Sequence, residues 1–454
     1  MKNNSPWLHQ LRKERALNKL TQDFKTDVAI VGGGIAGVST AFFILKNTSL
    51  KVTLLEGGRL GHGATGHNAG QIVSYFERPF QELVEEFGLE KSAHAQRCME
   101  GAWQLLDQMY TEAGLNIPLA RFNGFDGYSS FDQIVEVLED NVLKKQGGLT
   151  VEPLLIAEHI ESKDSIPQKF EGFYKLVPQS EILAKLETNN TGFIALLETQ
   201  KGVVNSALFT EEVAMYLLEK YADRFTIFEN TLIPKVVLKK DRVLLDAQRW
   251  VVEAERVILC TNGFEKIKIF DIEGLEIDTR FHHSVEGVVG RMSGYLEDLD
   301  KAPTAISYHM GAEEEFENME DPYFYLTRRT YEYQDNKRNL TCLGGPQKVI
   351  PDRGDYEPEY DYSQEFESLT DKFLRKLYNI EDTESVDYLF TWHGLMGYTP
   401  TGMRLVGVDP KNKHLLYNLG CNGVGILPSI FGGERISRLI KGEELPPSIF
   451  DPSL

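Results

Sequence analysis

The chain has 454 residues, of which 42% are hydrophobic; this is more than one ordinary core needs, so two domains are expected. Its 48 Lys and Arg residues face 68 Asp and Glu residues, and the net charge of -20 argues against nucleic acid or an anionic membrane as a partner. The four cysteines are widely spaced and form no CxxC pair, which argues against a disulfide framework or a zinc site and favours a reducing, cytoplasmic setting.

The first residues carry a charge at every few positions and lack the apolar core of a signal peptide. We therefore expect residues 1–24 to form an exposed helical extension. No apolar run is long enough to cross a bilayer, so no integral membrane segment is expected.

Residues 27–37, DVAIVGGGIAG, predict the strand, turn and helix of a dinucleotide-binding unit. In this pattern Gly32 permits the tight turn, Gly34 lets a pyrophosphate approach the backbone, and Gly37 lets the following helix pack on the strand. The helix N-terminus is then directed at the phosphates. A plain strand-to-helix turn would account for the glycines alone.

An acidic residue in the expected place strengthens this prediction. A second strand over residues 51–55 ends at Glu56, which follows Gly37 by 19 residues. A carboxylate at this position accepts hydrogen bonds from the ribose hydroxyls and opposes a 2′-phosphate, which disfavours NADP.

The chain beyond Glu56 alternates between the two expected domains. Residues 57–76 are rich in glycine and small residues and form a candidate functional segment. A helix pair is expected over 82–110, a helix over 206–221, and strands over 225–228, 234–238, 243–246 and 257–260. Alternation over 323–326 and 340–343 predicts an antiparallel sheet, and a helix is expected over 366–378.

The C-terminal part repeats the strand, glycine turn and helix pattern. A strand over 415–419 leads into GCNGVG and a helix that ends near residue 441. The N-terminus of this helix is a second source of aligned N–H groups, which would stabilise the negative charge of a reduced flavin near N1 and C2=O.

These segments together resemble the D-amino-acid oxidase superfamily of FAD-dependent oxidoreductases. The similarity rests on DVAIVGGGIAG…LLE, GHGATGHNAGQ, VILCTNG and WHGLMGYTPTG…NLGCNGVGI, so it includes both ends and the middle of the chain. It is greatest for the gamma-glutamylputrescine oxidase branch, and TGHNAG is also similar to dimethylglycine dehydrogenases. The implied fold is α/β, with a discontinuous Rossmann-like FAD domain (25–80, 192–275, 385–450) and a substrate domain on an antiparallel sheet (81–191, 276–384).

The resemblance implies FAD as cofactor and a long set of contacts to it. The implied FAD-binding residues are Gly32, Gly34, Ile35, Ala36, Gly37, Glu56, Gly57, Arg59, Gly63, Ala64, Thr65, His67, Asn68, Ala69, Gly70, Gln71, Val236, Thr261, Asn262, Gly263, Gly394, Met396, Asn422, Gly423, Val424, Gly425 and Ile426. The implied reaction moves a hydride from the carbon beside an amine to flavin N5, and water then hydrolyses the imine. The substrate is expected to be a small amine or N-substituted amino acid, with oxygen or another acceptor reoxidising the flavin.

Two departures from the family pattern bear on the substrate and on oxygen. Glycine and D-amino-acid oxidases use the arginine of WxGLR to hold a carboxylate, and this chain has Met396 at that position. Sarcosine oxidases have a cysteine bonded to the flavin in this neighbourhood, and Met396 cannot form that bond. A free α-amino acid therefore requires Arg291, Arg328, Arg329 or Arg404 to reach the site. Cys342 stands where sarcosine-type oxidases have a lysine that serves oxygen, so rapid reoxidation in air is in question.

The candidate catalytic residues are His67, Tyr308 and Arg328. His67 matches the position where dimethylglycine dehydrogenases attach FAD covalently, and without that bond it would orient substrate or tune the flavin. The residues Tyr308, His309, His282 and Tyr325 are expected in the pocket wall, although aromatic residues of a sheet usually belong to the core.

Two other functions fit the same cofactor. An FAD-dependent hydroxylase would need NAD(P)H, and the sequence has no second G-x-G-x-x-G between a strand and a helix to bind it. A redox sensor or structural flavoprotein would keep FAD without oxidising any amine.

Overall fold

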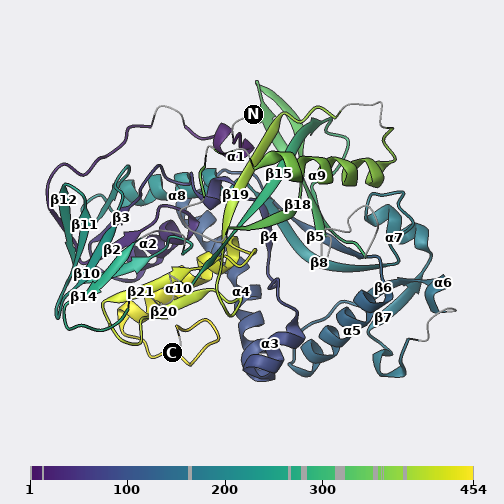
Figure 1. The fold of residues 1–454 in the computed structure, drawn as a ribbon, viewed down its shortest axis with the longest axis horizontal. Coiled ribbons are helices and arrows are strands. Elements are labelled where there is room, and N and C mark those ends of the chain that lie inside the picture. Colours follow the sequence, from purple (N-terminus) through teal and green to yellow (C-terminus); the bar gives the residue numbers. More distant parts are fainter. Residues whose placement is uncertain are drawn as a thin grey trace.

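The computed structural model describes residues 3–12, 15–161, 166–263, 267–277, 284–311, 323–350, 356–358, 360, 362–381 and 386–452. Two lobes lie side by side, one built on a mainly parallel sheet and the other on a large antiparallel sheet (Figure 1). This is the predicted α/β architecture, with segments distant in sequence brought together in each lobe.

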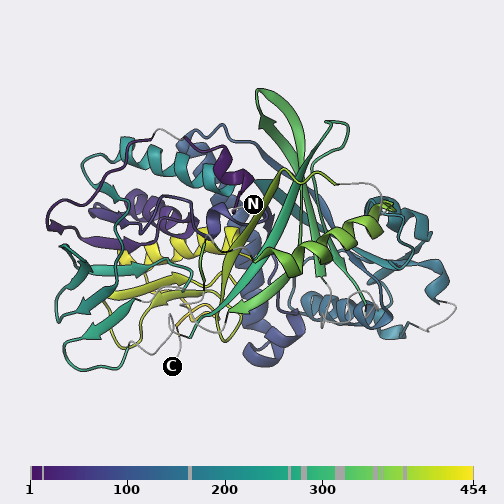
Figure 2. The same cartoon turned by 45° about the horizontal axis from the view of Figure 1, so that its top comes forward.

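The parallel sheet has the strand order β20-β21-β13-β2-β3-β9, and only β20 runs antiparallel to its neighbour. Its strands are β2 (Val28–Val31), β3 (Val52–Leu55), β9 (Phe225–Phe228), β13 (Arg256–Leu259), β20 (Leu405–Val408) and β21 (Leu415–Leu419). The strands are nearly continuous apolar runs because both faces of the sheet are covered. One face packs against α2 (Ile35–Asn47), α8 (Ser206–Lys220) and α10 (Ile426–Lys441), and Figure 2 shows α2 and α10 side by side.

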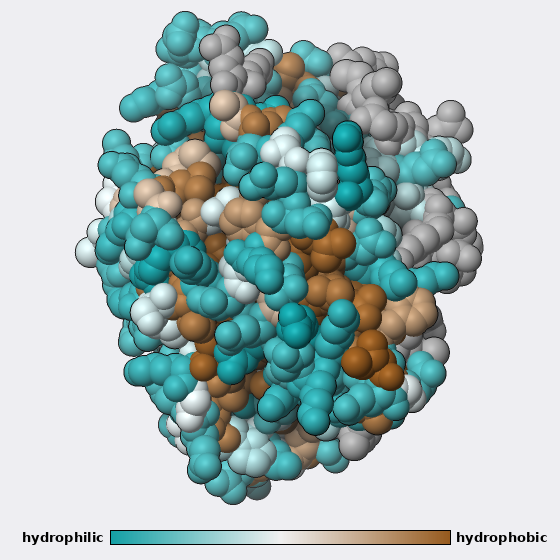
Figure 3. Space-filling view, turned by 90° about the vertical axis from the view of Figure 1, so that its left-hand side faces the viewer, coloured by the Kyte–Doolittle hydropathy of each residue, from teal (hydrophilic) through white to brown (hydrophobic). Residues whose placement is uncertain are grey.

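A smaller sheet covers the opposite face of the parallel sheet and shares a hydrophobic core with it. Its order is β1-β12-β11-β10-β14, formed by β1 (Phe24–Lys25), β10 (Lys235–Leu238), β11 (Val243–Ala247), β12 (Trp250–Ala254) and β14 (Lys268–Asp271). Its outer side carries scattered exposed apolar residues, including Val251, Phe270 and Ile272, and Figure 3 views the molecule from this side.

The second lobe is organised by a sheet with the order β19-β15-β18-β17-β16-β5-β8-β6-β7, with β4 paired to β8. It consists of β4 (Gln71–Val73), β5 (Leu119–Tyr128), β6 (Leu154–Ala157), β7 (Tyr174–Val177), β8 (Ala195–Val204), β15 (Glu286–Glu297), β16 (Thr304–His309), β17 (Tyr323–Tyr333), β18 (Asn336–Ile350) and β19 (Phe390–Tyr398). All pairs are antiparallel except β5 with β16 and β6 with β7. Since β8 and β19 lie in segments assigned to the FAD domain, the expected domain boundaries run through this sheet.

The remaining helices join and flank the lobes. They are α3 (Phe80–Phe87), α4 (Leu89–Ala113), α5 (Phe131–Gln146), α6 (Glu158–Glu161), α7 (Gln179–Lys185) and α9 (Ser363–Tyr378), with short 3-10 turns η1 (Ala64–Gly66) and η2 (Gln168–Phe170). The predicted helix pair over 82–110 is confirmed as α3 and α4, separated by Gly88 at φ 86°. Among the described residues, no helix combines the length and apolarity that a membrane span requires.

The N-terminal segment differs from the predicted exposed helix. Only α1 (Pro6–His9) is helical, and the Ser5 side chain caps its N-terminus by accepting a hydrogen bond from the Trp7 N–H. Residues 15–23 contain no helix. Trp7 is fully buried, and its ring meets Trp392 edge to face at a centroid distance of 6.2 Å. The charge pattern misled the prediction because Arg15 is not solvated but forms ion pairs with Glu211 and Glu229.

Candidate functional site

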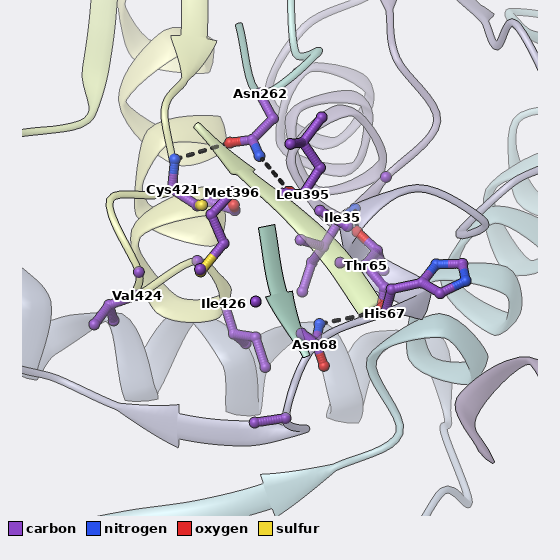
Figure 4. Close-up of a pocket in the computed structure, with 18 of the residues that line it drawn as sticks. Ile35, Thr65, His67, Asn68, Asn262, Leu395, Met396, Cys421, Val424 and Ile426 are labelled. Atoms are coloured by element: carbon purple, nitrogen blue, oxygen red, sulfur yellow. Dashed lines mark hydrogen bonds between the residues drawn. The ribbon is translucent and has the colours of Figure 1, made fainter. Parts of the chain in front are cut away.

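A cavity of about 350 Å³ runs from the glycine turn after β2 to the antiparallel sheet, a size typical of small-molecule and cofactor sites. Its wall is formed by the turn into α2, the segment around η1, the middle of β19, the glycine loop before α10 and the start of β17 (Figure 4). The site therefore lies where the two lobes meet.

Two glycines of the first turn, Gly32 and Gly37, have the conformational and packing roles expected from their spacing. Gly32 has φ 110° and lies so close to the Cys260 carbonyl that a Cβ atom there would come within 2.5 Å of its oxygen. At Gly37 a Cβ atom would overlap the Gly32 carbonyl, because α2 packs directly on β2. Gly34 has φ -81° and would tolerate a side chain by its backbone, but that side chain would meet the Thr65 hydroxyl.

Glu56 closes the far end of this turn. Its carboxylate accepts hydrogen bonds from the backbone N–H of Gly33 at 2.6 Å and of Gly58 at 2.7 Å. Burial raises the pKa of the Glu56 carboxyl, and the two N–H donors oppose that rise. The acid predicted after the second strand thus lies against the glycine turn, on the cavity wall.

The η1 segment forms a second wall. The Thr65 hydroxyl accepts a hydrogen bond from the Ile35 N–H at 3.0 Å and so caps α2, and the Asn68 side chain donates to Ser206 at 2.9 Å. The His67 ring nitrogen Nδ1 lies 3.0 Å from the Gly63 carbonyl oxygen, and burial lowers the pKa of the ring. Figure 4 shows this ring directed away from Met396 and Ile426, although the residue lines the cavity.

Asn262 ties together the two glycine-containing segments of the C-terminal part. Its Oδ1 accepts from the Cys421 N–H at 2.8 Å and its Nδ2 donates to the Leu395 carbonyl at 3.3 Å (Figure 4). Gly394 packs against η1, where any Cβ atom would overlap the His67 carbonyl. Helix α10 begins after Gly425 without a side-chain cap, so its N-terminus borders the cavity with its positive dipole end.

The end of the cavity at the antiparallel sheet is aromatic and contains one carboxylate. Tyr323 and Tyr325 alternate along β17 on the cavity face, and the Tyr325 ring packs over Gly344. Glu77, which follows β4, accepts a hydrogen bond from the Tyr398 hydroxyl at 2.6 Å. Burial raises the pKa of the Glu77 carboxyl, and the Tyr398 hydroxyl opposes that rise.

A buried ion pair lies behind the tyrosines at the aromatic end of the cavity. Lys201 is fully buried, with its Nζ 2.9 Å from Asp126 and 3.1 Å from the Ser307 hydroxyl. The Tyr323 hydroxyl donates to the same serine at 3.3 Å. Burial lowers the pKa of Lys201, while Asp126 opposes the change.

The arginines considered for carboxylate binding are not available to a substrate. Arg404 does line the cavity, but its guanidinium donates to the Asn418 side chain at 2.6 Å and to the carbonyls of Asn418 and Gly420 at 2.9 and 3.2 Å. Burial lowers the pKa of Arg404 to about 10. Among the residues that the structure describes, the cavity wall contains no other arginine and no lysine.

Two of the predicted catalytic residues lie elsewhere, so these predictions are corrected. Arg328 is buried on the opposite face of β17, where it binds Glu187 and Glu297. Tyr308 is fully buried in a hydrophobic core, and its hydroxyl donates to the Leu186 carbonyl at 2.8 Å. Neither lines the cavity.

The other candidates divide in the same way. Tyr325 lines the cavity, whereas His309 does not and instead stacks on Tyr128. Arg291 and Arg329 are buried away from it. The candidate His282 lies outside the described residues.

Most of the predicted cofactor contacts line the cavity. These are Gly32, Gly34, Ile35, Ala36, Glu56, Gly63, Ala64, Thr65, His67, Asn68, Ala69, Gln71, Thr261, Asn262, Gly394, Met396, Gly423, Val424, Gly425 and Ile426. The predicted contacts outside the lining are Gly37, Gly57, Arg59, Gly70, Val236, Gly263 and Asn422. Gly37 and Asn422 act behind the wall, the first in helix packing and the second by accepting from the Thr399 N–H at 2.8 Å. Val236 is buried in the core below the small sheet.

Sequence reasoning missed several wall residues at the aromatic end, notably Tyr75, Glu77, Tyr323 and Gln347. The segment SYFERPF gave one usable signal, an acid inside an aromatic stretch directly after the glycine-rich segment. The position of Glu77 against Gly423 depends on residues far apart in sequence, which no local pattern reports.

The residues present fit a dinucleotide such as FAD. The glycine turn has no side chain to block a pyrophosphate, and Glu56 lies at the distance along the chain expected for a ribose contact. Thr261 lines the cavity, and its hydroxyl is buried without a hydrogen-bond partner. The Nε atom of Arg59, three residues after Glu56, is also buried without a partner. The described residues contain no cluster of histidine, cysteine or carboxylate side chains suited to a metal ion.

Comparisons with known proteins agree with this geometry. Gamma-glutamylputrescine oxidoreductase from Escherichia coli strain K12 is 33% identical over 78 residues, which span 17% of this chain and 18% of that protein. The curated relatives that match are thus covered over less than a fifth of their length.

Solved structures match over nearly their whole length. Glycine oxidase from Geobacillus kaustophilus has a TM-score of 0.66 at 16% identity, covering 95% of this chain and 99% of that one. L-proline dehydrogenase from P. horikoshii has a TM-score of 0.67 at 17% identity, covering 95% and 97%. At these identities the likeness shows the fold. The model of the DAO family, FAD dependent oxidoreductase, matches residues 27–439, and the chain therefore belongs to this family of FAD-dependent oxidoreductases.

Proposed function

We propose that this protein oxidises the carbon–nitrogen bond of a small amine, with the cavity holding FAD at its glycine-rich end and the amine at its aromatic end. The observation that carries the proposal is the chemistry of the substrate end. It presents tyrosines, Met396 and a carboxylate, and no arginine or lysine of the described wall is free to bind a carboxylate. A substrate with a free α-carboxylate would lose its charge partner there.

The residues that line the cavity suggest how the cofactor is held. The glycine turn and the N-terminus of α2 would receive the pyrophosphate, and Glu56 the ribose hydroxyls. The N-terminus of α10 would face the pyrimidine side of the flavin, where its dipole favours negative charge. FAD supplies the acceptor for the hydride that leaves the carbon beside nitrogen.

The chain itself would contribute orientation and exclusion of water. Tyrosine rings on β17 and the Met396 side chain form apolar walls that fix a small amine in one pose. The pKa of His67 is lowered by burial, so its ring is neutral near pH 7, and its Nδ1 beside the Gly63 carbonyl acts as the hydrogen-bond donor. A covalent link from His67 to the flavin remains a prediction.

Anaerobic spectroscopy tests the proposed function. The purified protein is mixed without oxygen with primary amines, N-methyl amines, gamma-glutamylated polyamines and free amino acids, and the flavin absorbance is followed. Bleaching by amines and not by free amino acids is expected. Bleaching by none of them, with dithionite still reducing the flavin, would favour a sensor or structural flavoprotein.

Readmission of air then distinguishes oxygen from another acceptor. Cys342 is buried and does not line the cavity, so the residue at the position of the oxygen-serving lysine is neither charged nor accessible. Slow recovery of the oxidised spectrum is therefore expected, together with turnover in the presence of an artificial electron acceptor. Rapid oxidation of NADPH would instead support the hydroxylase.

A further inference from the structure

Glu77 is a carboxylate that the family pattern does not assign. It follows β4, is exposed to the cavity that it lines although protein atoms surround it, and lies so close to Gly423 that a side chain at position 423 would overlap the carboxylate. Gly423 has φ 73° and belongs to the glycine loop in front of α10. Glu77 therefore stands between the cofactor end and the aromatic end of the cavity.

No cationic side chain of the described residues neutralises Glu77, and the positive dipole end of α10, next to the glycine loop that the carboxylate contacts, is the nearest favourable group. The Tyr398 hydroxyl donates to it, and the hydroxyls of Tyr323 and Tyr325 are close enough for its charge to raise their pKa values, although burial is the larger cause. Cys421, on the glycine loop, is a thiol whose pKa burial raises, so it too is neutral. The neighbouring Arg78 points elsewhere, to Glu82, Glu86 and the Thr401 carbonyl.

Among the described residues no lysine or arginine forms an ion pair with Glu77, and the single arginine of the described wall, Arg404, donates its hydrogen bonds to Asn418 and Gly420. A carboxylate in such a place is most stable when a bound ligand brings a cation or a proton. Amines are cations in water near neutral pH, with pKa values of about 10.

We propose that Glu77 receives the ammonium group of the substrate and accepts one proton from it, with the Tyr398 hydroxyl holding the carboxylate in place. This inference rests on the proposed amine oxidation. One N–H bond of the ammonium breaks and one O–H bond forms on Glu77, while the electron pair stays on nitrogen. The products are a neutral amine and a neutral carboxylic acid.

This proton transfer solves a problem that the reaction poses. Hydride can leave the carbon only when the nitrogen lone pair is free, and at pH 7 only about one amine in a thousand is unprotonated in water. Inside the cavity, turning an ion pair into a neutral pair removes the cost of two desolvated charges. Burial raises the pKa of the Glu77 carboxyl, which favours the transfer from the ammonium.

Glu77→Gln tests the role of the carboxylate, because it keeps the size and an acceptor oxygen for Tyr398. We expect kcat/KM for an amine at pH 7 to fall about 100-fold, and the deficit to close as the pH approaches 10, where the free amine is abundant. Glu112→Gln is the matched control, since Glu112 pairs with Lys46 on the surface and does not line the cavity. An unchanged pH profile, or a loss equal at every pH, overturns the proposal.

Tyr398→Phe tests the hydrogen bond to Glu77 through the position of the pH profile. Without the hydroxyl donor, the pKa of the Glu77 carboxyl rises, so the acidic limb of the activity profile should move to higher pH. Tyr216→Phe is the control, because the Tyr216 hydroxyl accepts from Lys220 on α8, away from the cavity. No movement of the acidic limb in Tyr398→Phe overturns the role of the pair.

Binding of unreactive probes separates this inference from the proposed function. tert-Butylammonium has no hydrogen on the carbon beside nitrogen and cannot be oxidised to an imine, and pivalate is its carboxylate counterpart. Calorimetry or the flavin spectrum of the holoprotein should show that the ammonium binds, that pivalate does not, and that Glu77→Gln weakens the ammonium at least tenfold. Equal binding of both probes overturns the site at Glu77, whereas cation binding without reduction of the flavin by any amine overturns only the oxidase function.

Discussion

Removal of the Trp7 ring should release the flavin, although Trp7 is far from the glycine turn in sequence. The ring is fully buried, its Nε1 donates to the Asn68 carbonyl at 2.5 Å, and Gly70 packs against it. Asn68 in turn holds the η1 segment through the Thr65 carbonyl at 3.0 Å. Trp7 thus supports the cavity wall from behind.

The magnitude follows from burial. Trp7→Ala leaves a cavity under this wall and should cost about 3–5 kcal/mol, typical of a buried aromatic residue. If about 2 kcal/mol of this loss falls on the FAD-bound form, the affinity for FAD drops about 30-fold. Trp7→Phe keeps most of the ring and loses the hydrogen bond to Asn68, about 1 kcal/mol, or roughly a fivefold drop.

Two measurements check this expectation. Titration of the apoprotein with FAD gives the affinity, and thermal unfolding of the same samples gives the stability. Trp250→Ala is the control, because Trp250 is half-buried on β12 of the small sheet, outside the cavity wall. Wild-type flavin content and unfolding temperature in Trp7→Ala would refute the reasoning.

Three further outcomes are expected. Gly34→Val should abolish FAD binding, because its side chain would occupy the pyrophosphate site and displace the Thr65 hydroxyl that caps α2; the ratio of flavin to protein absorbance measures this, and thermal unfolding measures the effect on the fold. Arg328→Met should lower stability by about 1.5–3 kcal/mol by removing the ion pairs of this buried guanidinium with the partly exposed Glu187 and Glu297, yet change the KM for an amine less than twofold, as thermal unfolding and kinetics would show. Burial raises the pKa of Asp126, but Lys201, His309 and Ser307 together outweigh burial and lower it. The Asp126 carboxylate should therefore contribute stability above the unfolded pKa of about 3.9, and this stability is lost as the pH falls through the lower folded value. Asp126→Asn should be destabilised at pH 7 and lose this part of the acid dependence in unfolding scans.

The parts of the fold that could be predicted are those fixed by short-range chemistry. The strand before Gly32, the acid at Glu56 and the helix that ends at Lys441 follow from apolar runs and glycine positions within a few dozen residues. The family could be inferred for the same reason, since its motifs are local. The N-terminal helix failed because its charges are satisfied by Glu211 and Glu229, which lie about 200 residues away.

Two of the three catalytic candidates, Tyr308 and Arg328, lie away from the cavity because of strand register, whereas His67 lines it. Tyr308 pairs with Phe324 in the antiparallel β16–β17 ladder, and residues opposite each other point to the same face. Phe324 belongs to the hydrophobic core, so Tyr308 must as well. A tyrosine in an isolated sequence gives no indication of its face, because the face is set by pairing with a partner strand.

The same register explains why the substrate end is aromatic and not cationic. Along β17 the residues alternate between faces, which places Tyr323 and Tyr325 at the cavity and Arg328 on the side of Phe324. Bringing Arg328 to the cavity would require a shift of one residue, which would also bury the two tyrosines and expose the core face. The loss of a carboxylate-binding arginine at Met396 is therefore not compensated within this strand. The only charged side chain that the described wall presents at this end is the carboxylate of Glu77, which agrees with the amine substrate that we propose.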